Sequence, residues 1–290
     1  MQSGEIFRRT GVMSLSNVQH IGDTVKLHNG VRMPWVGLGV YKTQEGEQVE
    51  QAVLDAIEAG YRSIDTAKLY NNEEGVGRAI AQSGVKRDEL FVTTKVWNTD
   101  QGYEETLRAF EASRKRLSLD VIDLYLVHWP VTGKYKQTYK ALEKLYKDGY
   151  VRAIGVSNFL QPHLEDLLAE AEIKPMVNQV EYHPLLTQPH LHGFCRDNGI
   201  QLEAWSPLMQ GNLDLPLLTE LSDKYGKTPA QIVLRWDLQN GVVTIPKSVR
   251  KERIHENANL FDFELSEADM AALNGLDENK RFGPDPMTFV

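Results

Sequence analysis

Short apolar segments alternate with amphipathic segments along most of the chain. The apolar segments are each about as long as a buried strand, and they occupy residues 35–40, 63–67, 90–97, 121–129, 151–159, 175–183, 200–207 and 241–248. The intervening residues include stretches with the apolar spacing of an amphipathic helix, such as 45–60, 103–119, 139–149, 163–172 and 229–241. Because the strand segments are apolar at nearly every position, they favour parallel strands that are covered on both faces.

Eight strands that alternate with helices are compatible with a closed (β/α)8 barrel or with an open doubly wound sheet. The strand count and the chain length favour the barrel. An open dinucleotide-binding sheet would carry a glycine-rich fingerprint after its first strand. The nearest match is GVGRAI at residues 75–80, which lacks the third glycine and follows polar residues rather than a strand. We therefore interpret these glycines as packing positions near the start of a helix.

The N-terminal part of the chain is predicted to differ from the barrel. Asn29-Gly30 separates two short β-like runs, which is a strong signal for a β-hairpin. We therefore predict an α/β fold consisting of a single-domain (β/α)8 TIM barrel, residues 21–290, with an N-terminal β-hairpin. Residues 1–20 are expected to form a flexible N-terminal extension. Arg8-Arg9 is not followed by an apolar stretch, so no signal peptide is predicted.

The composition narrows the possible partners. The chain of 290 residues has a formal net charge of −8, which argues against a broad nucleic-acid-binding face. No apolar run approaches the roughly 20 residues of a membrane-spanning helix. Cys195 is the only cysteine, so no intrachain disulfide can form, and we expect a buried thiol rather than a nucleophile. We expect a cytoplasmic monomer that acts on a small molecule and binds neither nucleic acid nor membranes.

Ionisable residues occur where consecutive predicted strands end. Asp65 ends the second strand, Tyr70 lies in the loop that follows, Lys95 ends the third strand and His128 ends the fourth. In a barrel of this kind the carboxyl ends of the strands surround the active-site mouth. We therefore predict that these four side chains meet there and form a catalytic group.

The predicted chemistry is proton donation to a carbonyl oxygen. A free tyrosine has a pKa of about 10, and the Lys95 ammonium is expected to lower the pKa of Tyr70. Asp65 is the expected counter-ion of Lys95, and His128 can orient a substrate oxygen. Each residue also has a structural interpretation: a loop cap for Asp65, a packing residue for Tyr70, a solvated charge for Lys95 and a core histidine for His128.

These residues belong to a longer pattern of motifs. DTAKLYNNE at residues 65–73 is followed by TTKVW, LYLVHWP, GVSNF, NQVEYHP, WSPL and IPKS, in that order. In these motifs the chain resembles the aldo-keto reductases from about Thr24 onward. Among the aldo-keto reductases it most resembles the bacterial branch of glyoxal, methylglyoxal and 2,5-diketogluconate reductases. The resemblance implies a barrel, without a Rossmann fold, that reduces aldehydes and ketones such as glyoxal and methylglyoxal with NADPH.

The resemblance also implies a role for each motif residue. Tyr70 is expected to be the proton donor, Lys95 and Asp65 its tuning pair, and His128 the donor that orients the substrate. Ser157, Asn158 and Gln179 are expected to bind the nicotinamide amide, and Trp205 to stack on its ring. The other expected cofactor contacts are Val40, Asp65, Ser206, Pro207, Leu208, Ile245, Lys247, Ser248, Arg250, Arg253, Glu256 and Asn257.

Within the last group, Lys247 and Arg253 match ligands of the cofactor's 2′-phosphate, with Ser248 and Arg250 as further candidates. Glu256 and Asn257 match adenine contacts. Simpler interpretations stay open for some of these residues. Ser157-Asn158 resembles a helix N-cap, Trp205 a core aromatic residue, and the basic segment a solvated helix end.

Aromatic residues are expected to line the substrate pocket. By resemblance, the lining residues are Tyr41, Tyr70, Trp97, His128 and Trp129. An aromatic pocket with few charges suits small neutral aldehydes and ketones. Only residues 277–290 follow Leu276, so the C-terminal loop is short and we expect a broad substrate range.

Two other functions stay open. A Schiff-base aldolase would use a neutral Lys95 as its nucleophile, although Asp65 nearby would keep that lysine protonated. A regulatory subunit could bind the cofactor without turnover. No metal site is predicted, because His190 and His192 are two positions apart in an expected helix and do not face the same side.

Overall fold

Eight parallel strands form the centre of the protein in a computed structural model that describes residues 18–289. The strands are β3 (Gly37–Gly39), β4 (Ser63–Asp65), β5 (Phe91–Val96), β6 (Ile122–Val127), β7 (Val151–Ser157), β8 (Val177–Glu181), β9 (Gln201–Trp205) and β10 (Val243–Thr244). Each strand pairs with its neighbour in the chain. Parallel bridges from Val36 to Thr244 and from Gly39 to Lys247 join the first strand to the last. The sheet is therefore a closed barrel, which confirms the fold prediction.

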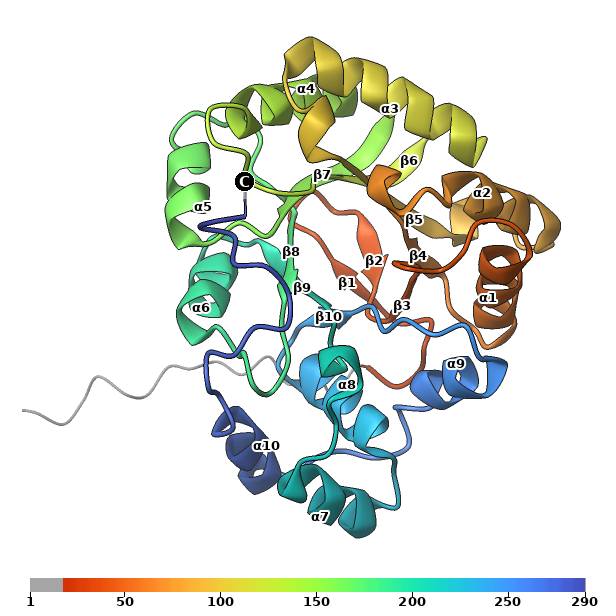
Figure 1. Cartoon of the computed structure of the whole chain (residues 1–290), viewed down its shortest axis with the longest axis vertical. Coiled ribbons are helices and arrows are strands. Elements are labelled where there is room, and N and C mark those ends of the chain that lie inside the picture. The colour runs from red at the N-terminus through yellow and green to blue at the C-terminus, as the bar shows by residue number, and fades with distance from the viewer. Residues whose placement is uncertain (1–17, 290) are drawn as a thin grey trace, which may run out of the picture.

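Helices surround the barrel, as Figure 1 shows. The structure assigns α1 (Glu47–Glu58), α2 (Glu73–Gln82), α3 (Tyr103–Leu117), α4 (Tyr135–Lys147), α5 (Gln161–Leu168), α6 (Pro189–Asp197), α7 (Pro216–Tyr225), α8 (Pro229–Gln239), α9 (Lys251–Ala258) and α10 (Glu267–Asn274). Every helix expected from the apolar spacing is present. No helix among the described residues combines the length and the apolar character that crossing a bilayer requires.

The GVGRAI glycines lie in α2, where they permit close packing. A Cβ on Gly75 would lie 2.4 Å from Val49 of α1, and a Cβ on Gly77 would lie 2.4 Å from the backbone oxygen of Leu117 at the end of α3. Real Cβ atoms do not approach other atoms this closely, so both positions require glycine. The interpretation as packing positions is confirmed.

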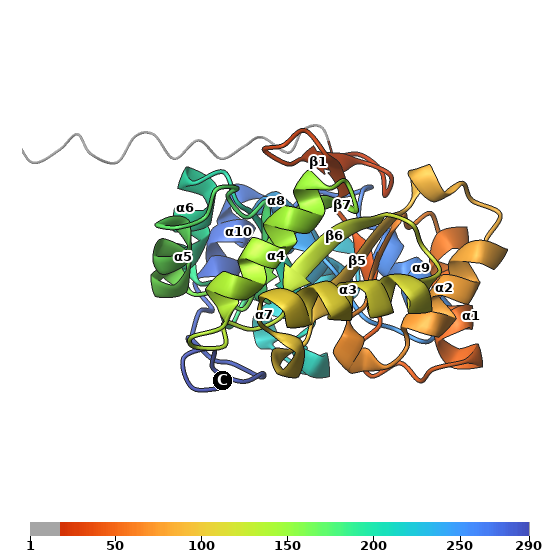
Figure 2. The ribbon, with the colours of Figure 1, turned by 90° about the horizontal axis from the view of Figure 1, so that it is seen from above.

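The hairpin of β1 (Thr24–Lys26) and β2 (Arg32–Pro34) closes the end of the barrel where the strands begin. Its turn contains Asn29 and Gly30, and Gly30 has a φ of 90° that favours glycine. The Asn29 side-chain amide donates to the backbone oxygen of Arg152, at the start of β7, over 2.9 Å. Figure 2 shows the hairpin and the C-terminus at opposite ends of the barrel. The mouth at the carboxyl ends of the strands is therefore bordered by loops and by the C-terminal segment, and not by the hairpin.

The predicted N-terminal extension falls mostly outside the described residues, which begin at Val18. Val18 is buried and packs with the core. The end of the extension at residue 20 stays a prediction.

Candidate active site

Lys95 connects three groups at the mouth of the barrel. Its side chain is fully buried in β5, and its ammonium lies 2.6 Å from Asp65 Oδ1 at the end of β4. The same Nζ donates to the backbone oxygen of Thr66 over 3.0 Å and to the Tyr70 hydroxyl over 3.3 Å. Tyr70 ends the short 3₁₀ helix η1 (Lys68–Tyr70). The structure therefore brings together the proton-donor candidate and its predicted tuning pair.

The loop that carries Tyr70 is held by buried polar contacts. Asn72 donates to the backbone oxygens of Val40 and Thr43 over 2.9 and 3.0 Å, and it accepts from the Thr66 hydroxyl over 2.7 Å. Glu73, the first residue of α2, accepts from Arg116 Nε over 2.7 Å. These contacts explain why an Asn-Glu pair follows the tyrosine so closely, since they fix η1 against the first strand and against α3.

The protonation states at the mouth follow from burial and from neighbouring charges. Burial lowers the pKa of Lys95, but Asp65 and Tyr70 raise it by more, so the net shift is upward. Burial raises the pKa of Tyr70 to about 12, although Lys95 acts in the opposite direction. The expectation of a lowered Tyr70 pKa is therefore wrong as a net result: the Lys95 charge lowers the pKa, but burial raises it by more. At neutral pH the site thus holds an ammonium and a protonated phenol.

His128 lies directly after β6 and borders the tyrosine. Its ring centroid is 5.9 Å from that of Tyr70 and 5.1 Å from that of Trp97. Burial and the Lys95 charge hold the pKa of His128 well below its usual value. The imidazole is therefore neutral, and its buried Nδ1 has no hydrogen-bond partner among the described residues. A neutral ring can orient a substrate oxygen without adding a positive charge to the pocket.

The predicted nicotinamide-binding residues form a connected group beside this site. The Ser157 hydroxyl donates to the backbone oxygen of Gln179 over 2.8 Å. The Asn158 side chain donates to the backbone oxygen of His128 over 3.0 Å and accepts from Trp205 Nε1 over 2.8 Å. The N-cap of α5 is Leu160, so the helix-cap interpretation of Ser157-Asn158 is wrong. Trp205 is half-buried at the end of β9 rather than a core residue.

Gln179 links two carboxyl groups inside the barrel. Its Nε2 donates to Asp65 Oδ2 and to Glu203 Oε2, each over 2.8 Å. Glu203 lies in the middle of β9 and is fully buried. Burial and the Asp65 charge raise its pKa to about 8, although Gln179 and Lys95 act in the opposite direction. Sequence reasoning missed Glu203, and the available signal was a carboxylate in an otherwise apolar strand.

The basic segment after β10 contains cations without a carboxylate partner. Within the described part of the chain, Lys247, Arg250 and Arg253 form no ion pair, whereas Lys251 lies 2.7 Å from Glu58. Desolvation lowers the pKa of Lys247, and the charge of Lys42 lowers it further. Cations without a carboxylate partner at the start of α9, together with the Lys42 charge that acts on Lys247, make this segment suited to an anion.

The remaining predicted cofactor contacts lie after β3, β9 and β10 and in α9. The Val40 amide donates to the backbone oxygen of Asp65 over 3.1 Å, and the Ile245 amide donates to that of Ala204 over 3.3 Å. Ser206, Pro207 and Leu208 follow β9 directly, and Ser206 has a φ of 52°. The Ser248 hydroxyl accepts from the Arg250 amide over 3.1 Å, and Glu256 accepts from the Thr228 hydroxyl over 2.9 Å. Asn257 is buried.

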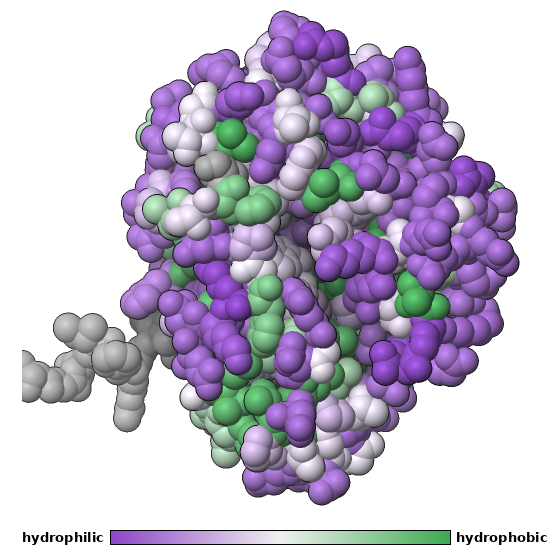
Figure 3. Space-filling model, in the orientation of Figure 1, coloured by the Kyte–Doolittle hydropathy of each residue, from purple (hydrophilic) through white to green (hydrophobic). Residues whose placement is uncertain are grey.

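Aromatic side chains border the mouth, which is hollowed near its centre in Figure 3. The Tyr41 ring lies 5.0 Å from Tyr70 and is 50% exposed. Trp129 is buried, and its ring lies 4.4 Å from that of Phe289 in the C-terminal segment. The rings of Tyr41, Tyr70, His128 and Trp97 therefore form a continuous aromatic group beside the Lys95 ammonium.

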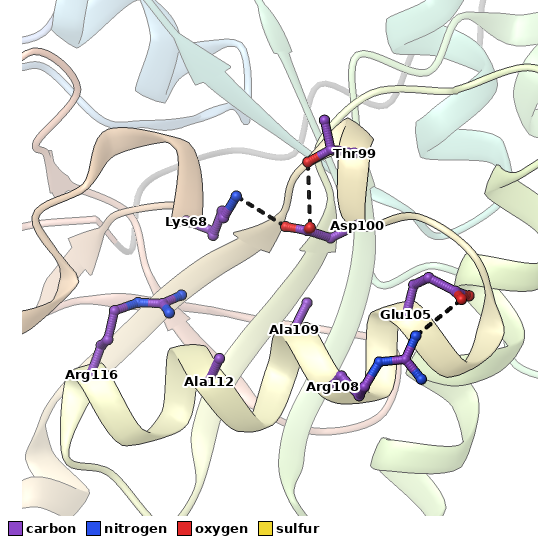
Figure 4. Close-up of a pocket in the computed structure, with 8 residues that line it drawn as sticks. All are labelled: Lys68, Thr99, Asp100, Glu105, Arg108, Ala109, Ala112 and Arg116. Atoms are coloured by element: carbon purple, nitrogen blue, oxygen red, sulfur yellow. Dashed lines mark hydrogen bonds and ion pairs between the residues drawn. The ribbon is translucent and has the colours of Figure 1, made fainter.

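A second cavity of about 280 Å³ lies outside the mouth, between α3 and the loops that carry Lys68 and Asp100 (Figure 4). Its charged groups neutralise one another. Lys68 pairs with Asp100 over 3.2 Å, Arg108 with Glu105 over 3.1 Å, and Arg116 with Glu73 over 2.7 Å. The charged side chains that line this cavity are therefore all paired with one another or with Glu73.

Comparison with known proteins agrees with this geometry over nearly the whole chain. The profile of the Aldo/keto reductase family matches residues 35–278. The chain belongs to the aldo/keto reductase family. It is 63% identical to a glyoxal reductase of Bacillus subtilis over 265 residues, which is 91% of this chain and 96% of that protein.

Two further relatives support the assignment. The chain is 47% identical to the methylglyoxal reductase DkgA of Escherichia coli, with 91% of this chain and 97% of that protein covered. A crystal structure of a Bombyx mori aldo-keto reductase in complex with NADP superposes with a TM-score of 0.85 at 39% identity, and it covers 91% of this chain and 95% of that chain. Family and fold thus agree with the resemblance in the motifs.

In this aldo/keto reductase the C-terminal segment is docked onto the mouth. The Glu181 carboxylate accepts from the backbone amides of Phe282, over 2.6 Å, and Gly283. A Cβ on Gly283 would lie 2.3 Å from Trp205. The short tail therefore covers one part of the indole, a contact that the sequence did not reveal.

The remaining sequence candidates have structural roles. Cys195 is buried, as predicted, and burial raises the pKa of its thiol to about 12. The ring of His192 packs against Tyr182 at 5.8 Å between centroids, and His190 is exposed. Among the described residues, no group of three or more His, Cys, Asp or Glu side chains is placed to hold a metal ion.

Proposed function

We propose that this aldo/keto reductase reduces small aldehydes and ketones, such as glyoxal and methylglyoxal, to alcohols with NADPH. The observation that carries the proposal is the buried contact of Lys95 with both Asp65 and the Tyr70 hydroxyl. The names of the relatives from Bacillus subtilis and Escherichia coli point to the same substrates. The aromatic rim around Tyr70 suits small, uncharged carbonyl compounds.

The residues present fit NADPH. Lys247 and Arg253, which have no carboxylate partner among the described residues, would hold the 2′-phosphate, with Ser248 and Arg250 beside them. Ser157, Asn158 and Gln179 carry the donors and acceptors that a primary amide requires, and Trp205 presents an aromatic face near them. Bound there, NADPH would supply the hydride that the carbonyl carbon takes up.

The proton for the carbonyl oxygen comes from Tyr70. His128, neutral because its pKa is low, donates a hydrogen bond that holds the substrate oxygen near the phenol. As the oxygen gains charge, the Tyr70 O–H bond breaks and the proton moves to it. The phenolate that remains is stabilised by the Lys95 ammonium, which lies 3.3 Å away and is itself held by Asp65.

The aldolase alternative is disfavoured by the same contacts. A Schiff base requires a neutral lysine, but the net shift of the Lys95 pKa is upward. The Lys95 Nζ also already donates hydrogen bonds to three oxygens. Lys95 therefore acts as a fixed cation.

The test is the consumption of NADPH, followed at 340 nm, with a panel of aldehydes and ketones. We expect turnover with methylglyoxal and glyoxal and slower turnover with NADH. Binding of NADPH without turnover of any carbonyl would instead support a regulatory subunit. A covalent adduct with a carbonyl compound that borohydride traps on Lys95 would support an aldolase.

A further inference from the structure

We propose that Glu203 is a positioning residue that, together with Asp65, fixes the side-chain amide of Gln179 for the cofactor. The inference rests on the proposed NADPH-dependent function and extends it to a residue outside the predicted group of four. Glu203 is fully buried inside the barrel, where a carboxyl group without a function would be costly.

The hydrogen bonds around Gln179 define the orientation of its amide. A primary amide has two N–H donors and one acceptor oxygen. Both donors of Gln179 are used, one on Asp65 and one on Glu203, each over 2.8 Å. Asp65 also accepts from the Lys95 ammonium and can only accept, so the nitrogen end must face the two carboxyl groups.

The oxygen of Gln179 is left for another partner. Among the described residues no hydrogen bond reaches it, and the neighbouring Asn158 and Ser157 are the other predicted nicotinamide-binding residues. A carboxamide NH2 group is a donor that fits this free acceptor. Glu203 therefore does not touch the cofactor in this proposal but acts through Gln179.

Glu203 also places a titratable group next to the catalytic pair. The charged groups that act on Glu203 are Asp65 on β4 and Lys95 on β5. The Gln179 amide lies between Glu203 and Asp65 and donates to both. When Glu203 is protonated, Asp65 is the single negative charge beside Lys95. When Glu203 loses its proton, a second negative charge faces the site, which disfavours the Tyr70 phenolate. The rate of carbonyl reduction should then fall as Glu203 ionises, around pH 8.

The first test is a double-mutant cycle on NADPH binding, measured by the quenching of intrinsic fluorescence so that no turnover is needed. Glu203→Leu should raise the NADPH dissociation constant about tenfold, the equivalent of one lost hydrogen bond of about 1.4 kcal/mol. In a Gln179→Leu background the same change should have an effect of less than about twofold. An equal loss of affinity in both backgrounds would show that Glu203 does not act through Gln179, and would overturn the proposal.

The second test uses the conservative variant Glu203→Gln, which keeps an acceptor and should fold. It should retain NADPH affinity within about threefold, and its kcat should lose the decrease that the wild type shows around pH 8. An unchanged pH profile would overturn the proposed proton linkage. Glu143→Gln is the matched control, because Glu143 is also buried and accepts from the Ile173 amide over 2.9 Å, on α4 outside the mouth.

The two proposals can fail separately. If the wild type turns over no carbonyl compound with NADPH, the proposed function fails, whatever the variants do. If the wild type is active and the cycle shows no coupling between Glu203 and Gln179, only the positioning role fails.

Discussion

The unpaired cations after β10 give a prediction about cofactor choice. Lys247 and Arg253 form no ion pair within the described residues, whereas Lys251 in the same segment is neutralised by Glu58. If the first two hold the 2′-phosphate, each charge-assisted contact should contribute about 1.5–3 kcal/mol. Both side chains are exposed, so we use the lower value, and their sum of about 3 kcal/mol corresponds to roughly 150-fold in affinity.

The perturbation is the double substitution Lys247→Ala with Arg253→Ala. We expect the dissociation constant of NADPH to rise by roughly two orders of magnitude and that of NADH, which lacks the phosphate, to change less than about threefold. Titration of intrinsic fluorescence with both cofactors measures this directly. For the wild type, the preference for NADPH should also shrink as salt is added, because exposed charges are screened.

Lys251→Ala is the matched control for this prediction. It removes a cation from the same segment, but one that already has a carboxylate partner, so NADPH affinity should stay nearly constant. The reasoning would be refuted if NADPH and NADH affinities fell together in the double variant. It would also be refuted if Lys251→Ala weakened NADPH binding as much as the double substitution does.

Three further predictions concern the buried groups and the tail. Lys95→Met should leave Asp65 buried without its cation and lower the free energy of unfolding by about 3–5 kcal/mol; adding Asp65→Asn should restore stability in chemical denaturation but not kcat. The pKa of Glu203 is raised to about 8 from its ordinary 4.5, so the native state holds a proton on Glu203 that the unfolded chain loses. The stability of the native state should therefore fall as pH rises from about 5 to 8. Glu203→Gln should lack this component, which amounts to at most about 1.4 kcal/mol per pH unit, and equal pH slopes in the two proteins would contradict the raised pKa. Gly283→Ala should displace the tail from Trp205 and weaken NADPH binding, while the melting temperature stays within a few degrees; unchanged affinity would show that the tail does not position the indole.

Much of the fold could be predicted because buried parallel strands are apolar at nearly every position. Residues 122–127 and 151–157 are examples, since each strand is visible in the sequence without reference to its partners. Helix α10 was not predicted because Leu273 is its only fully buried side chain, so it has almost no apolar periodicity. A helix that lies on the surface leaves a weak pattern.

The site was predictable only as far as motif residues lie at strand ends. Glu203 was missed because its partner Gln179 is on another strand, and the hydrogen bond that links Gln179 to Asp65 spans 114 positions in the chain. The pKa of Tyr70 could not be predicted either. Its value depends on how far burial outweighs the nearby Lys95 charge, and that balance requires the three-dimensional structure.

The central claim is that Tyr70 donates the proton to the carbonyl oxygen. The most direct measurement is single-turnover oxidation of bound NADPH by methylglyoxal in the wild type and in Tyr70→Phe. The phenylalanine ring keeps the contact with Tyr41 and His128 but has no transferable proton. We predict that the hydride-transfer rate falls by about 10²–10⁴ while the NADPH dissociation constant changes less than about twofold. A Tyr70→Phe enzyme that keeps half of the wild-type single-turnover rate would contradict the account.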